Sequence, residues 1–165
     1  MSLIVKNLQR VVSFNIGRLE RDLGIIRQLM GVETYDVAVL CVDDRKIQEL
    51  NRNYRGQGVP TDVLSFPAYE IASPGLLPDI SEDEVPDLGD MFLGLPYIQH
   101  QCQQDGGNLS EVLPVIATHG LCHLIGYDHK TENQWKQMFD KELSIFQEYN
   151  KLTGLNLKPL LDKME

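Results

Sequence analysis

Three of the chain's four histidines, His119, His123 and His129, lie within eleven residues of one another. His119 and His123 are four positions apart in a stretch that we expect to be helical, so their β-carbons would lie roughly 6 Å apart on one face. Gly126 allows the backbone to turn back with a positive φ, which would let His129 supply a third nitrogen. Three neutral imidazoles with an open fourth position are typical of a catalytic zinc site. The spacing therefore predicts one Zn²⁺ per chain, or another divalent transition metal.

Other side chains near the histidines have different expected roles. Cys122 would point roughly 100° away from His123 around the helix, so we interpret it as a packing residue. Asp128 could act as a carboxylate that orients a ligating imidazole without touching the metal. His100 lies apart from the cluster, and we interpret it as an ordinary residue.

The histidine spacing also occurs in metzincin peptidases, which carry a glutamate directly after the first histidine as general base. Gly120 occupies that position here and offers no base. A metzincin-like metallopeptidase is therefore the weakest of the functions considered. Because glycine costs ~1 kcal/mol in a helix relative to alanine, we expect another backbone or a substrate phosphate to approach Gly120 closely.

A second candidate group is Arg55, which precedes a loop containing Gly56, Gly58 and Pro60. A guanidinium is planar, always charged and able to bind a phosphate through two hydrogen bonds. Beside a hydrolytic metal, Arg55 could stabilise the negative charge that develops on a phosphoryl group. From the residues alone, Arg55 is thus a candidate for charge stabilisation in phosphoryl chemistry, and the alternative is an ordinary solvated loop arginine.

Composition limits the class of protein. The chain has 165 residues, 42% of them hydrophobic, and a formal net charge of −9, which suits one globular domain. The acidic total argues against a non-specific nucleic-acid binder, because phosphate contacts need a basic face. The three cysteines are widely spaced, which favours a reducing compartment over a disulfide framework. No run of apolar residues is long enough to span a membrane.

Strands and helices alternate along the chain, which predicts an α+β or α/β domain: a mixed sheet of about four strands packed with helices. The metal cleft would lie on the histidine-bearing helix, for which Ser110 is the expected cap. Thr131 and Gln134 form a capping box for the last helix, and Gly154 ends it. The expected strands are 2–9, 35–43, 62–66 and 88–95, and the expected helices are 17–30, one from 43 or 44, one from 96, 110–126 and one from 131.

Residues 69–87 are the candidate insertion in this domain. They are rich in proline and acidic residues, contain no lysine or arginine, and are long for a loop without secondary structure. We therefore expect a mobile acidic insertion at 69–87 that could associate with a basic protein.

Two blocks of this sequence together resemble the YbeY family. His119–His129 reads HGLCHLIGYDH and matches the family signature H-G-x-L-H-L-x-G-Y-D-H with one departure, at Cys122. Residues 51–67 match N-x-x-Y-R-x-x-x-x-P-T-D-V-L-S-F-P, and Leu88-Gly89-Asp90 resembles a third, shorter block. Two long motifs in the right order are hard to obtain by chance.

The resemblance implies that residues 1–165 form one α+β domain with a metal cleft, with ligands His119, His123 and His129 and a catalytic Arg55. It implies a metal-dependent single-strand endoribonuclease of ribosomal RNA processing. Its partners would be ribosomal RNA, small-subunit proteins and assembly factors, with no membrane. The N-terminus and the insertion look most like animal members, so we expect a mitochondrial location, or else a cytoplasmic one. A non-catalytic ribosome-assembly factor with a structural metal is the alternative.

Overall fold

A mixed four-stranded sheet organises the chain in the computed structural model, which describes residues 2–160. The strand order is β1-β2-β4-β3, in which β1, β2 and β4 run parallel and β3 pairs antiparallel with β4. β3 is therefore one edge of the sheet. The strands are β1 (Leu3–Asn7), β2 (Asp36–Val42), β3 (Val63–Pro67) and β4 (Asp87–Gly94).

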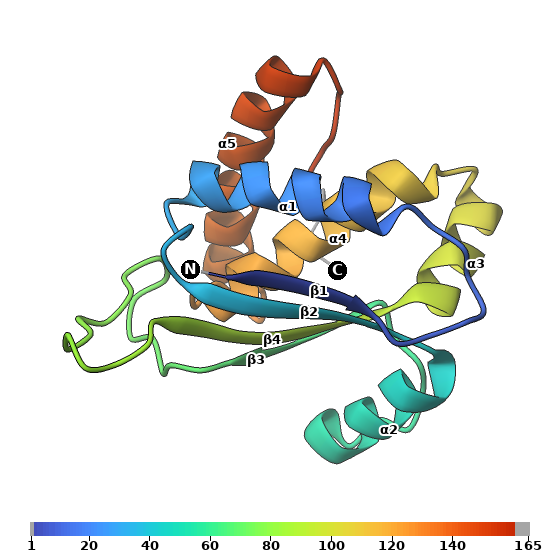
Figure 1. Cartoon of the computed structure of the whole chain (residues 1–165), viewed down its shortest axis with the longest axis horizontal. Helices are drawn as coiled ribbons and strands as arrows, with labels where there is room; N and C mark the ends of the chain where they lie inside the picture. Colours follow the sequence, from blue (N-terminus) through green and yellow to red (C-terminus); the bar gives the residue numbers. More distant parts are fainter. Residues whose placement is uncertain (1, 161–165) are drawn as a thin grey trace.

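Helices cover both faces of this sheet, but unequally (Figure 1). On one face lie α1, α4 and α5, while α2 lies on the opposite face. The helices are α1 (Ile16–Met30), α2 (Asp44–Arg55), α3 (Leu95–Asp105), α4 (Leu109–Leu124) and α5 (Glu132–Thr153). The predicted α+β architecture with a four-stranded mixed sheet is confirmed.

Alternation along β2 explains why two cores form. Val39 and Cys41 belong to the main core with α1, α3, α4 and α5, whereas Val42 packs with Ile47 of α2 and with Leu64 of β3. Successive side chains of a strand point to opposite faces of the sheet, so a strand apolar at every position can be buried on both sides. The main core contains the bulk of the buried apolar residues and supports the face that carries α4.

Side-chain caps fix where the helices begin. Asp43 caps α2, and Thr131 with Gln134 forms the predicted capping box of α5. Helix α4 differs from the prediction, because its cap is Asn108 rather than Ser110. The Asn108 carboxamide oxygen accepts hydrogen bonds from both the backbone N–H and the hydroxyl of Ser110. The two residues are both cap-forming types and lie two positions apart, and Asn108 takes the capping position.

The acidic segment 69–87 contains no helix or strand before β4 begins at Asp87. Its first part nevertheless contacts the loop after α4. The Gly75 N–H donates to the Ile125 carbonyl at 2.9 Å, and a Cβ at Gly126 would lie 2.8 Å from the Ile71 side chain. Mobility of the segment stays a prediction. No helix within residues 2–160 has the length and apolar character needed to cross a membrane.

Candidate metal centre

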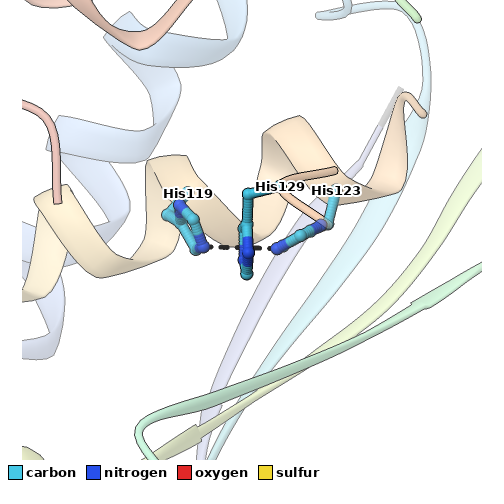
Figure 2. Close-up of side chains that lie close together, drawn as sticks. All are labelled: His119, His123 and His129. Carbon is cyan, nitrogen blue, oxygen red and sulfur yellow. Dashed lines mark hydrogen bonds between the residues drawn. The ribbon is translucent and has the colours of Figure 1, made fainter. Parts of the chain in front are cut away.

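Helix α4 carries the first two histidines of the centre into the interior (Figure 2). His119 is 4% exposed, whereas His123 lies one turn later and is half-buried. Thr118, the residue before His119, donates its hydroxyl to the Pro114 carbonyl at 2.7 Å. Because His119 and His123 are four positions apart, the helix places their two imidazoles on one face, as predicted.

A tight turn after α4 brings in the third histidine. Gly126 has φ +102°, and the Tyr127 N–H donates to the Cys122 carbonyl at 3.0 Å. The His129 ring then lies beside both of the others (Figure 2), with its centroid 5.4 Å from that of His119 and 5.1 Å from that of His123. One ring nitrogen from each histidine lies within 4.8 Å of the other two. The predicted positive φ at Gly126 and the gathering of the three imidazoles are both found.

The hydrogen bonds of two rings define which nitrogens face the centre. His123 Nδ1 lies 2.9 Å from the Tyr127 carbonyl, which can only accept, so this nitrogen carries the proton. His119 Nδ1 lies 3.2 Å from an Oε2 carboxylate oxygen of Glu142 and donates in the same way. Both Nε2 atoms are then lone-pair acceptors, and they face each other at 3.2 Å.

This arrangement fits a metal ion. Two facing lone pairs with no proton between them repel unless a cation lies between them. Ligand nitrogens about 2.0–2.1 Å from a tetrahedral zinc are roughly 3.3 Å apart, close to the 3.2 Å between the Nε2 atoms of His119 and His123. Burial, and next the neighbouring His119, lower the pKa of His123 to about 4. His123 is therefore neutral at pH 7 and its lone pair is available.

The remaining side chains beside the histidines lie outside the centre. Cys122 is fully buried in the main core, and burial raises the pKa of its thiol, in agreement with a packing role. Asp128 accepts from the His129 backbone N–H and pairs with Lys130, and in the described part of the chain it holds no imidazole. The idea that Asp128 orients a ring is wrong, because its carboxylate closes the local turn. His100 is exposed on α3.

The carboxylate that does contact an imidazole is Glu142 of α5, which the sequence analysis did not identify as a site residue. Glu142 is 1% exposed. It lies 23 residues after His119 on another helix. The sequence signal for Glu142 was a charged residue on the apolar face of a helix, where charged residues are rarely buried without a partner.

Gly120 is explained by packing against β4. A Cβ at this position would lie 2.8 Å from Sδ and 2.9 Å from Cε of Met91, which is fully buried. The Ser65 hydroxyl also donates to the Gly120 carbonyl at 3.0 Å. The close neighbour is therefore the Met91 side chain, rather than a backbone or a phosphate. A glycine here lets α4 lie close to the sheet.

We expect Gly120→Ala to lower the free energy of unfolding by about 1 kcal/mol, because overpacking costs about 1–3 kcal/mol and alanine's helix propensity offsets ~1 kcal/mol of it. In a Met91→Val background, which removes Sδ and Cε, the same change should cost nothing. Urea unfolding of the four proteins gives the coupling between the two sites. An equal cost of Gly120→Ala in both backgrounds would refute the contact.

Arg55 is the last residue of α2, and the structure does not place it against the histidines. Phe66 of β3 contacts the Tyr54 ring, with centroids 4.6 Å apart, while the adjacent Ser65 contacts α4. Helices α2 and α4 therefore cover opposite faces at the β3 edge (Figure 1). Arg55 is exposed, and within residues 2–160 its side chain has no hydrogen bond or ion pair. Its catalytic role stays a prediction.

Comparisons with known proteins agree with the geometry. The model of a family described as endoribonuclease YbeY matches residues 7–150. The chain belongs to the YbeY family. A human protein named endoribonuclease YbeY is 46% identical over 160 residues, covering 97% of this chain and 95% of its own. A YbeY of the same name from Caldicellulosiruptor bescii is 35% identical over 153 residues, covering 89% and 96%.

A solved structure resembles this chain in its fold. The solution structure of a Thermotoga maritima protein covers 97% of this chain and 99% of its own, with a TM-score of 0.53. The two sequences are 20% identical. This likeness shows that the two proteins share the arrangement of sheet and helices over 97% of this chain.

Proposed function

We propose that this protein is a metal-dependent endoribonuclease that acts in ribosomal RNA processing. Membership of the YbeY family and the names of its relatives support the reaction. The observation that carries the metal dependence is the pair of Nε2 lone pairs, on His119 and His123, that face each other at 3.2 Å with His129 beside them.

The three histidines would hold the metal ion through one nitrogen each. When bound, such an ion supplies Lewis-acid chemistry, since it polarises a phosphoryl oxygen or lowers the pKa of water. Glu142 and the Tyr127 carbonyl hold the His119 and His123 rings by their Nδ1 atoms. Phosphodiester hydrolysis has no need of the missing glutamate at position 120 if charge stabilisation lowers the barrier.

Arg55 would bind RNA phosphate and offset the negative charge that develops during cleavage. Its exposed guanidinium lacks a competing carboxylate partner in the described part of the chain, which supports this role. Because α2 and α4 cover opposite faces of the sheet, an RNA strand that reached both Arg55 and the histidines would pass over the β3 edge. This would favour single-stranded RNA, which can bend around that edge.

The finer assignments follow the family resemblance. We propose Zn²⁺ as the metal, because three imidazoles with an open position suit it. The proposed substrate is ribosomal RNA of the small subunit, in contact with its proteins and assembly factors, and the proposed location is the mitochondrion. The 46% identity to a human YbeY supports an animal-type assignment.

One experiment distinguishes the proposed endoribonuclease from two other functions. A ribosome-assembly factor with a structural metal would bind RNA without cutting it. A metallopeptidase would need a base at Gly120, where the Cβ position is instead filled by Met91. Incubating the purified protein with a defined single-stranded RNA and, separately, with casein distinguishes the three. We expect cleavage of RNA only; binding without cleavage supports the assembly factor, and faster casein hydrolysis supports the peptidase.

A further inference from the structure

We infer that Glu142 is a positioning residue of the metal centre, an inference that rests on the proposed metal site. Its carboxylate holds the imidazole of His119 in the tautomer and orientation that present Nε2 to the metal. Glu142 would touch neither the metal nor the RNA. It would act through the hydrogen bond between Oε2 and the Nδ1 of His119, which is 3.2 Å long.

The burial of Glu142 is the first observation behind this inference. The residue is 1% exposed on α5, and its Oε1 has no hydrogen-bond partner among the described residues. The crevice beside it is lined by His129, Trp135, Met138 and Phe139. The indole N–H of Trp135 in this crevice is also buried, and it has no acceptor among the described residues.

A buried carboxylate is costly unless a positive charge compensates it. Among residues 2–160, the only hydrogen-bond or ion-pair partner of the Glu142 side chain is the ring of His119. Positive charge brought to the other side of that ring would offset the cost. The carboxylate of Glu142 and the facing Nε2 lone pairs of His119 and His123 therefore both favour a cation bound at Nε2, from opposite sides of the His119 imidazole.

The tautomer of His119 is the property that Glu142 controls. A carboxylate accepts and cannot donate, so it places the proton on Nδ1 and leaves Nε2 free to bind. Gln would keep the shape but could turn its N–H₂ toward Nδ1, which would move the proton to Nε2 and block binding. Such carboxylate contacts to ligating histidines typically change metal affinity by about 10- to 100-fold.

The test is a titration of the zinc-free full-length chain with Zn²⁺ in competition with a chromophoric chelator. Glu142→Gln should bind zinc about 10- to 100-fold more weakly than wild type, while its circular dichroism spectrum stays unchanged. Glu148→Gln is the matched control, because Glu148 lies on the same helix and is exposed. It should bind zinc as wild type does.

A second readout measures the tautomer of His119 directly. Long-range ¹H–¹⁵N correlation spectra of the zinc-free wild-type protein should show His119 as the Nδ1–H tautomer, and Glu142→Gln should show a loss of that preference. Unchanged zinc affinity in a folded Glu142→Gln, or an Nε2–H tautomer of His119 in wild type, would overturn the inference. If wild type itself binds no zinc, the proposed metal site fails instead, and the two failures are thereby distinguished.

Discussion

Replacing any one of the three histidines by alanine is expected to empty the metal centre. Wild type should hold about one zinc ion per chain, with nitrogen ligands at about 2.0–2.1 Å. His119→Ala, His123→Ala and His129→Ala each leave two imidazoles, one fewer than the three protein ligands typical of catalytic zinc sites. Elemental analysis of the purified variants measures the loss, and RNA cleavage should disappear with the metal.

His100→Ala is the matched control, because His100 is exposed on α3, away from the centre. It should keep the wild-type zinc content and activity. The result that would contradict the assignment is an unchanged zinc content in all three variants of the centre, with the three proteins still folded.

Arg55→Glu is expected to abolish RNA cleavage while zinc content and melting temperature stay close to wild type. The reversed charge repels the phosphates that a guanidinium would bind. Because the Arg55 side chain has no hydrogen bond or ion pair in residues 2–160, none is lost. Arg55→Lys should retain less activity than its charge suggests, since an ammonium cannot form two parallel hydrogen bonds with a phosphate. Cleavage rates under single-turnover conditions measure the effect.

Arg45→Glu is the control for Arg55, because Arg45 is an exposed arginine near the other end of α2. It should weaken RNA binding at low salt but leave cleavage of bound RNA intact. If Arg55→Glu unfolds the protein, Arg55 is a structural ion-pair partner and its catalytic role loses its support. If the variant cleaves RNA at the wild-type rate, Arg55 has no role in the reaction.

The part of the site that could be predicted from the sequence is the part encoded locally. His119, His123 and His129 are fixed by one helix turn and one glycine turn, both of which depend on neighbours in the chain. Glu142 could not be recognised in the same way. Its contact with His119 depends on how α5 packs against α4, which the periodicity of either helix alone does not determine.

The same contrast between local contacts and contacts of distant elements explains where else the structure departs from the sequence-based predictions. The α+β class followed from alternating strands and helices, but the position of Arg55 relative to the histidines depends on which face of the sheet α2 covers. Gly120 was recognised as unusual for a helix, yet its neighbour Met91 lies in β4. To predict contacts between distant elements, one needs the order of the strands in the sheet, and the sequence pattern did not determine that order.

The most direct test of the account is a zinc titration followed by RNA cleavage. The purified protein is stripped of metal with a chelator, and Zn²⁺ is returned in steps while cleavage of a defined single-stranded RNA is measured. We predict no cleavage without metal and a linear recovery that stops at about one zinc per chain, as a single three-histidine site requires. Full cleavage by the metal-free protein, or no cleavage at any zinc content, would contradict the proposed metal-dependent endoribonuclease.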